Sequence, residues 1–221
     1  MDTIMTCDVI TLHVPFVKDG PHPTVDLLNA ERISALRAGQ LLINACRGEV
    51  IDEPALLTRL QEPEAPLVVL DVFRNEPEIN QALLPYLWFA TPHIAGHSVE
   101  GKLRGTQMAY EHVCEAMGVT PELTMEDFLT APEARHFDVP DATAEALDWD
   151  TLSDLILSVY DVSKDDGLFR RDTGKEGFLN LRKHYPARRE CSAGFLRLAA
   201  PVSEGITEQL SGLGFQFNFV R

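Results

Sequence analysis

Short apolar runs that end in ionisable residues recur along the first hundred positions. The run at residues 67–73 contains Asp71 and is followed by Glu76, and the run at 87–90 is followed by His93. Nearly continuous apolar segments of this length are typical of strands buried on both faces of a parallel sheet. Ligands of open α/β sheets bind beyond the carboxyl ends of such strands. We therefore expect Asp71, Glu76 and His93 to converge on one site.

Two further apolar runs, at residues 8–15 and 40–46, are separated by helical patterns. Apolar positions on one face predict a helix over about 27–36 that is closed by Gly39. Asp52 is a suitable N-cap for a second helix, because its carboxylate can accept hydrogen bonds from the N–H groups of the first turn. Strands that alternate with helices predict an α/β fold with a doubly wound parallel, Rossmann-like sheet.

The second half of the chain is organised differently. A long helix is predicted between Ser98, which can cap it, and Gly118, which ends it. Between 119 and 166, acidic residues outnumber basic ones and prolines recur, which is typical of a connection between domains. Apolar runs at 195–200 and 215–220 flank a helical pattern at 203–213, which predicts a small α/β unit. The predicted domains are a sheet domain at 1–118, a linker at 119–140 and a C-terminal domain at 141–221.

A formal net charge of −15 over 221 residues narrows the classes of partner. Nucleic acids and anionic membranes would repel such a chain, so we expect no nucleic-acid partner and no membrane association. The basic run at 182–189 could form a phosphate or RNA patch, but pairing with the acidic stretch or with a partner subunit is the favoured explanation.

Targeting and metal-binding features are missing from the sequence. No apolar run reaches the roughly 20 residues that a membrane helix needs, and the first residues lack the cationic start of a signal peptide. The four cysteines are far apart, which argues against a zinc site and against a disulfide framework. We therefore expect a cytoplasmic protein with reduced thiols and no metal.

His93 follows Thr91 and Pro92 at the end of a predicted strand. A neutral imidazole can take the proton of a hydroxyl while a hydride leaves the same carbon, and a carboxylate beside it holds its tautomer. Glu76 is the candidate for that carboxylate. The alternative is that His93 is an ordinary loop histidine and that Glu76 only precedes Pro77 at the start of a helix.

Three residues at other strand ends have two interpretations each. Arg47 offers a planar guanidinium suited to a substrate carboxylate, or it forms a surface ion pair. Asp71 closes an apolar strand and needs hydrogen-bond donors if it is buried, and either a nicotinamide amide or a backbone turn would supply them. Cys46, beside Arg47, is a potential nucleophile, although a structural thiol is the favoured interpretation.

Three motifs, taken in order, resemble the second half of the cofactor domain of the D-2-hydroxyacid dehydrogenases. They are NACRG at residues 44–48, LDVFRNEP at 70–77 and TPHIAG at 91–96. Segments 97–106, 160–166 and 181–190 are similar to members of that family with an extra C-terminal domain. The resemblance implies an NAD-dependent oxidoreductase that acts on a small phosphorylated 2-hydroxy acid and forms a homodimer through the C-terminal domain.

The same resemblance implies roles in the chemistry. His93 would be the acid/base, Glu76 its partner, and Arg47 the residue that holds the carboxylate and the reacting oxygen of the substrate. His97 would contact the substrate, at a position where the family usually has tyrosine. Each of these residues follows a predicted strand.

The resemblance also implies a set of residues at the NAD site. Asp71 would contact the nicotinamide side of the cofactor, and Gly96, Val14, Ala45 and Cys46 would line the same site. Val14 stands where the family usually has threonine, which matters little if only its backbone is used.

The family's glycine-rich G-x-G-x-x-G segment after an early strand is absent from this sequence. We therefore expect a fragment that lacks the pyrophosphate cradle and the N-terminal substrate domain, with negligible activity on its own. Two alternatives stay open. One is a related dehydrogenase that acts on phosphoglycerate or glyoxylate, and the other is a non-catalytic dimer that senses NAD.

Overall fold

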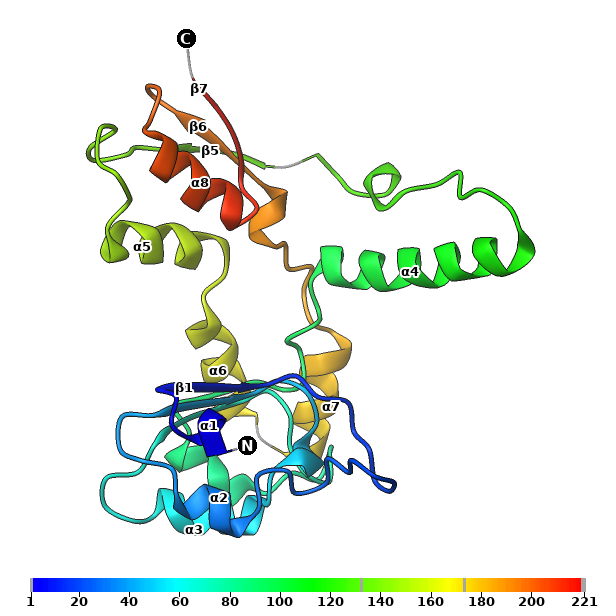
Figure 1. Cartoon of the computed structure of the whole chain (residues 1–221), viewed down its shortest axis with the longest axis vertical. Coiled ribbons are helices and arrows are strands. Elements are labelled where there is room, and N and C mark those ends of the chain that lie inside the picture. The colour runs from blue at the N-terminus through cyan, green and yellow to red at the C-terminus, as the bar shows by residue number, and fades with distance from the viewer. Residues whose placement is uncertain (1, 132, 173, 220–221) are drawn as a thin grey trace. The chain divides into compact units, whose positions relative to one another are not determined.

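The computed structural model describes residues 2–131, 133–172 and 174–219, and the chain divides into two compact units (Figure 1). Unit 1 consists of Met1–Ala95 and Val162–Tyr185, and unit 2 consists of Gly96–Asp161 and Pro186–Arg221. Because residues 162–185 fold back onto the first unit, the units divide the chain at other positions than the predicted domain boundaries. The predicted domain boundaries at 118 and 140 therefore stay a prediction.

Within the described residues, unit 1 is built on a parallel sheet with the strand order β1-β2-β3-β4. This arrangement confirms the predicted α/β fold with a parallel, Rossmann-like sheet. Its helices, 3-10 helices (η) and strands are α1 (Asp2–Met5), β1 (Val9–Leu12), α2 (Ala30–Ser34), β2 (Leu41–Asn44), η1 (Gly48–Val50), α3 (Glu53–Leu60), β3 (Leu67–Leu70), η2 (Gln81–Tyr86), β4 (Phe89–Ala90), α6 (Val162–Arg171) and α7 (Lys175–Lys183).

The strands of unit 1 end in register. Leu12, Asn44, Leu70 and Ala90, the last residues of β1 to β4, are partners in one row across the sheet. Because the strands are parallel, the loops that follow them all begin at the same edge. The residues that the sequence singled out after these strands are therefore presented along one rim.

The core of unit 1 is made by the strands and by segments that pack on them. Leu42 and Val68 are completely buried, as expected for central strands of a parallel sheet. Phe73 extends this core beyond β3, and its ring centroid lies 5.8 Å from that of Phe169 in α6. Phe169 in turn packs edge-on against Phe178 of α7 at 5.8 Å. Burial of each such side chain contributes about 1.5–3 kcal/mol, so the returning segment is anchored mainly by its two phenylalanines.

Helix α6 closes the edge of the sheet at β4. The Asp166 carboxylate accepts a hydrogen bond from the Ala90 N–H at 2.7 Å, and Arg170 pairs with Asp166 at 2.8 Å. Arg170 also donates to the carbonyl oxygens of Leu84 and Leu87. A bare edge strand would leave such groups open to pairing with another chain. This helix was not predicted from the sequence, because only one of its residues, Phe169, is buried.

Of the two helices predicted in this unit from local sequence signals, one begins at the predicted residue and the other does not. Asp52 caps α3 as predicted, with its carboxylate accepting from the Ala55 N–H at 3.1 Å. The helix predicted over 27–36 was wrong at both ends, since α2 spans only Ala30–Ser34. Asn29 caps it through the Arg32 N–H, and the Leu28 N–H donates instead to the Val50 carbonyl oxygen at 3.0 Å. Residues before Asn29 therefore pair with the η1 region rather than extend the helix.

In the described part of unit 2, a second parallel sheet has the order β5-β6-β7, and α8 lies along it (Figure 1). Its elements are α4 (Val99–Met117), η3 (Met125–Asp127), β5 (Glu133–Phe137), α5 (Trp149–Val159), η4 (Cys191–Ala193), β6 (Gly194–Leu198), α8 (Glu204–Gly212) and β7 (Gln216–Phe219). Leu155 of α5, Leu196 of β6, and Ile206 and Leu210 of α8 share its core. The predicted small α/β unit is confirmed, although β5 was not predicted and the end of the run at 215–220 lies outside the described residues.

Helix α4 begins and ends as the sequence indicated. The Ser98 hydroxyl oxygen accepts from the Gly101 N–H at 2.9 Å, and Gly118 ends the helix with φ of 68°. Only glycine adopts that left-handed conformation without strain. Most of the helix surface is exposed, and among its residues Glu100 and Cys114 are buried.

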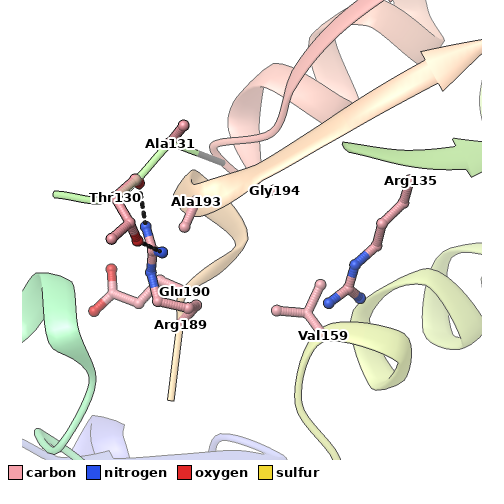
Figure 2. A pocket seen from close by; sticks show the side chains of 8 residues that line it. All are labelled: Thr130, Ala131, Arg135, Val159, Arg189, Glu190, Ala193 and Gly194. Atoms are coloured by element: carbon pink, nitrogen blue, oxygen red, sulfur yellow. Dashed lines mark hydrogen bonds between the residues drawn. The ribbon is translucent and has the colours of Figure 1, made fainter. Parts of the chain in front are cut away.

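A buried polar cluster joins the start of α4 to the chain segment that leads into η4. Glu100, only 2 % exposed, accepts from Arg189 Nε at 2.5 Å and from the Glu190 N–H at 3.0 Å. The Ser98 hydroxyl donates to Glu190 Oε1 at 2.5 Å. Arg189 also donates to the Thr130 hydroxyl oxygen at 2.8 Å (Figure 2). Three stretches of unit 2 are therefore tied together by one carboxylate and one guanidinium.

We expect the contribution of Glu100 to stability to disappear in acid. Burial alone would raise the pKa of the Glu100 carboxyl, but hydrogen bonds from Arg189 and from main-chain N–H groups lower that pKa below its ordinary value. A lowered pKa in the folded state adds stability above the unfolded pKa of 4.5, and this stability is lost as pH falls through the folded value. Glu100→Gln should cost about 2 kcal/mol of unfolding free energy at pH 7.

Urea denaturation at pH 7 and at pH 3, followed by circular dichroism, checks this prediction. The matched control is Glu115→Gln on the exposed surface of the same helix, which should be neutral at both pH values. A deficit in Glu100→Gln that is equally large at both pH values would contradict the assignment.

The described residues contain neither a helix suited to crossing a membrane nor a cluster suited to a metal ion. None of the helices in this part of the chain has both the length and the apolar character needed to cross a membrane. No group of three or more His, Cys, Asp or Glu side chains is arranged there to hold a metal ion.

Candidate functional site

The loops after β2, β3 and β4 interlock at the carboxyl edge of the first sheet. Gly48, after β2, lies so close to the chain after β3 that an added Cβ would come within 2.0 Å of the Phe73 carbonyl carbon. Only glycine fits there, because the neighbouring atoms are backbone and cannot move aside. The His93 N–H, after β4, donates to the Asp71 carbonyl oxygen at 2.7 Å. The loops that carry the residues singled out from the sequence are therefore in direct contact.

Asp71 organises the turn between β4 and unit 2. Asp71 is 5 % exposed, and its carboxylate accepts from the Thr91 hydroxyl at 2.6 Å, from the Ile94 N–H at 2.8 Å and from the Ala95 N–H at 2.9 Å. A backbone turn thus supplies the donors that a buried carboxylate needs, which was one of the two possibilities left open by the sequence. The Asp71 carboxylate therefore holds the loop that contains His93 in its folded conformation.

Glu76 and His93 form the central pair of this rim. His93 Nδ1 lies 2.6 Å from Glu76 Oε2, and the side chains are 25 % and 18 % exposed. The other carboxylate oxygen of Glu76 accepts from the Phe73 N–H at 2.9 Å, so the carboxylate is fixed to the loop after β3. With Nδ1 directed at a carboxylate, the neutral imidazole carries its proton on Nδ1 and presents Nε2 as a base.

The backbone of His93 is in an uncommon conformation. Its φ is 57°, in the left-handed region that residues with a Cβ rarely occupy. The conformation is held by hydrogen bonds from its N–H to the carbonyl oxygens of Asp71 and Thr91. Such strain persists only where surrounding contacts outweigh it, and it is common at functional sites.

Arg47 lies on the loop after β2, which is held in place by Asn44. The Asn44 side chain donates to the Arg47 carbonyl oxygen at 2.9 Å and accepts from the Cys46 N–H at 3.2 Å. The Arg47 side chain is exposed, and its Nη1 donates to the Cys46 carbonyl oxygen at 2.6 Å. No ion pair to Arg47 is found among the described residues, so most of its five donors are open to a ligand.

Glu53 is a residue of this region that the sequence analysis missed. It is the first residue of α3, is 4 % exposed, and its carboxylate accepts from the Arg74 N–H. Burial raises the pKa of Glu53 to about 7 against the lowering effect of Arg74, and the carboxylates of Glu76 and Glu49 add to the rise. The only sequence signal was a second acidic residue directly after the N-cap Asp52, which usually marks nothing more than a helix start.

The other residues predicted at the NAD site, and His97, which was predicted to bind substrate, are distributed over both units. Val14 follows β1 and packs against the core of unit 1, where Cys46 is also buried. The Cys46 thiol lies 3.1 Å from the side-chain oxygen of Asn44, as suits a structural thiol. Ala45 is partly buried beside it, whereas Gly96 and His97 belong to unit 2. The roles of Val14, Ala45, Cys46 and Gly96 at a cofactor and of His97 at the substrate stay predictions.

One part of NAD suits the donors and acceptors at this rim. An ionised carboxylate accepts about four hydrogen bonds, and three protein donors in the described residues meet Asp71. The remaining acceptor position fits an amide N–H donor such as the carboxamide of nicotinamide. The pyrophosphate of NAD is usually bound by a G-x-G-x-x-G loop, and this sequence contains no such loop.

Unit 2 contains a cavity of about 240 Å³ near β5 and β6, drawn in Figure 2. Arg135 and Arg189 line it from opposite sides in this view. Both guanidinium groups donate hydrogen bonds to protein oxygens. Arg135 donates to the Ser158 carbonyl oxygen at 2.6 Å, and Arg189 donates to oxygens of Glu100 and Thr130. The cavity therefore offers no clear site for an anionic ligand.

The chain matches two protein families, and the first match lies on the sequence that forms the first sheet. Residues 1–95 match the family described as "D-isomer specific 2-hydroxyacid dehydrogenase, NAD binding domain". Residues 135–214 match a second family, described as "Domain of unknown function (DUF3410)". The first match includes all four strands of the first sheet, whereas the second includes β6 and most of β5 and ends before β7.

Curated relatives carry the name erythronate-4-phosphate dehydrogenase. The one from Pseudoalteromonas atlantica is 47 % identical over 194 residues, which cover 87 % of this chain and 51 % of the relative. The one from Colwellia psychrerythraea is 41 % identical over 215 residues, which cover 97 % of this chain and 53 % of the relative. The chain thus spans about half the length of the curated relatives it matches.

Among solved structures, a D-lactate dehydrogenase from Aquifex aeolicus, complexed with NAD and lactic acid, is 29 % identical with a TM-score of 0.42. The similarity covers 53 % of this chain and 39 % of that one.

Proposed function

Since this chain carries, over residues 1–95, the NAD-binding domain of the D-isomer specific 2-hydroxyacid dehydrogenase family, we propose that it is part of an NAD-dependent oxidoreductase. Its substrate is 4-phospho-D-erythronate, which is oxidised at the 2-hydroxyl to the 2-oxo acid. The substrate follows from the name of the relatives, which are up to 47 % identical in the matches given above. The reaction belongs to the biosynthesis of pyridoxal phosphate.

The observation that carries the proposal is the pair formed by Glu76 and His93. With Nδ1 held by the Glu76 carboxylate at 2.6 Å, Nε2 of His93 is the free base that takes the proton of the 2-hydroxyl. The carboxylate stabilises the imidazolium that forms, and its bond to the Phe73 N–H keeps it from turning away. NAD supplies the acceptor for the hydride that leaves the same carbon.

Arg47 completes the chemistry at the substrate. Its exposed guanidinium is a planar fork that binds the carboxylate of a 2-hydroxy acid and polarises the oxygen on C2. Gly48 places this loop against the chain that carries Glu76, through its contact with Phe73. The binding of His97 to substrate, a homodimer through the C-terminal domain and a cytoplasmic location are further parts of the proposal that rest on the family resemblance.

A substrate panel tests the proposal. The protein expressed from its complete gene is mixed with NAD and with 4-phosphoerythronate, 3-phosphoglycerate or glycolate, and the absorbance of the reduced cofactor is followed. We expect kcat/KM for 4-phosphoerythronate to exceed the others by at least tenfold. Turnover of phosphoglycerate or glycolate, without turnover of 4-phosphoerythronate, would show that the proposed substrate is wrong. NAD binding without turnover of any 2-hydroxy acid would favour a non-catalytic sensor.

A further inference from the structure

We propose that Glu53 is a positioning residue that holds Glu76 against His93 through the turn that follows β3. The proposal deepens the proposed function and rests on it for its kinetic consequence. Glu53 touches neither Glu76 nor His93 through a hydrogen bond; its carboxylate is bonded to the main chain of the turn that carries Glu76. Its place at the start of α3 is therefore what connects that helix to the acid/base pair.

In the turn from Phe73 to Glu76, two consecutive main-chain N–H groups each donate a hydrogen bond to a carboxylate. The Phe73 N–H donates to Glu76 Oε1 at 2.9 Å, and the Arg74 N–H donates to Glu53 Oε1. Asn75, next in the turn, has φ of 62°. Removal of the Glu53 carboxylate leaves the Arg74 N–H without its acceptor, beside another carboxylate that is already bonded to the same turn. That carboxylate is Glu76, and a shift of Glu76 towards Arg74 draws it away from His93 Nδ1.

Two further contacts hold the turn to which Glu53 is bonded. The Arg74 guanidinium is turned to Asp26 and to the carbonyl oxygens of Glu49 and Ile51, so it holds the turn from the side of η1. Gly48 packs against the Phe73 carbonyl group and the Arg74 nitrogen from the loop after β2. Arg74, Gly48 and Glu53 thus all contact the turn, and of these three residues Glu53 is the one whose side chain accepts a hydrogen bond from the turn's backbone.

The hydrogen bond from Arg74 requires an oxygen atom rather than a charge. The charged groups around Glu53 are Arg74, Glu76 and Glu49, and burial favours the protonated form of Glu53. Either form of the carboxyl group keeps an acceptor oxygen. A glutamine has the same shape and also keeps an acceptor, which makes Glu53→Gln a rescuing substitution if the positioning role is correct.

The test compares three variants by two measurements. In the full chain, NMR of the imidazole protons reports the His93 Nδ1–H, whose downfield resonance depends on the bond to Glu76. We expect that resonance to be lost in Glu53→Ala and retained in Glu53→Gln. The matched control is Asp52→Ala, which removes the adjacent N-cap of α3 but no contact with the turn, and which should retain it. If Glu53→Ala does not fold, Glu53→Asp replaces it, since the shorter side chain withdraws the oxygen from Arg74.

The second measurement is made on the protein from the complete gene, with 4-phosphoerythronate and NAD. Glu53→Ala should lower kcat at least tenfold with KM for NAD within threefold of the parent, and Glu53→Gln should restore kcat to within threefold. An unchanged His93 resonance in Glu53→Ala, or an equal loss in Asp52→Ala, would overturn the positioning role. An inactive parent protein whose variants still show the expected resonances would refute the proposed function and leave the positioning role standing.

Discussion

Replacement of His93 by alanine is expected to lower kcat by about 10²–10⁴, the usual contribution of a positioned general acid or base. The imidazole is the only group of the described rim that combines a free basic nitrogen with a carboxylate on its other nitrogen. Glu76→Gln should cause a large loss as well, because an amide can turn its NH₂ towards Nδ1 and favour the wrong tautomer. Steady-state kinetics with 4-phosphoerythronate and NAD measures both effects.

His112→Ala is the matched control for this pair of variants. His112 is an exposed histidine of α4 whose Nδ1 lies 2.7 Å from the Met108 carbonyl oxygen of its own helix, and its loss should leave kcat within twofold. A His93→Ala variant that keeps kcat within threefold of the parent would remove His93 from the mechanism. The Glu76–His93 contact would then be no more than a structural hydrogen bond.

Asp71→Ala is expected to lower the unfolding free energy of unit 1 by about 3–5 kcal/mol. The substitution strands three donors at once, the Thr91 hydroxyl and the Ile94 and Ala95 N–H groups, and each buried donor without an acceptor costs about 1–3 kcal/mol. Partial access of water to Ala95, which is exposed, keeps the sum below the upper limit. Urea denaturation followed by circular dichroism gives the change from the midpoint and slope.

Two companion variants sharpen the Asp71 experiment. Asp71→Asn keeps one acceptor oxygen but turns an NH₂ towards groups that are themselves donors, so it should recover only part of the loss. Asp8→Ala, directly before β1, removes a 97 % exposed carboxylate with one long contact to Arg37 and should change stability by less than 0.5 kcal/mol. A loss below 1 kcal/mol in Asp71→Ala would show that Asp71 does not template the loop.

The elements that could be predicted are those whose cause lies within a few consecutive residues. Asp52 and Ser98 cap their helices through donors three residues further on, and Gly118 ends α4 in the conformation that suits glycine. The apolar runs at 8–15, 40–46, 67–73 and 87–90 each produced a strand, shortened at its ends. In each case the interaction that decides the structure is local or repeats along the chain.

The elements that were missed depend on partners far along the chain. Helix α6 is mostly polar and is held by Phe169 against Phe73 and by Asp166 on the Ala90 N–H. The start of α2 was misplaced because Leu28 pairs with residues near Val50. Neither contact leaves a periodic trace in the neighbouring sequence, so pattern alone could not find it.

The candidate site shows the same division. Asp71, Glu76 and His93 could be picked out because an ionisable residue that ends an apolar strand is unusual, and their spacing matches a known family. The sequence could not decide which donors satisfy Asp71, and it gave no reason to notice Glu53. Both answers depend on burial, since a carboxylate acquires an obligatory partner only when folding removes water from it.

What the sequence determined by itself was therefore the order of strands and helices, their caps, and the residue types presented where the strands end. Only the tertiary structure decided which of those residues meet: His93 with Glu76 across 17 positions, and Glu53 with the Arg74 N–H across 21. The physical reason is that backbone capping and apolar periodicity act between near neighbours in the chain. Desolvation and hydrogen bonding of buried carboxylates act between whatever groups the packed sheet brings together.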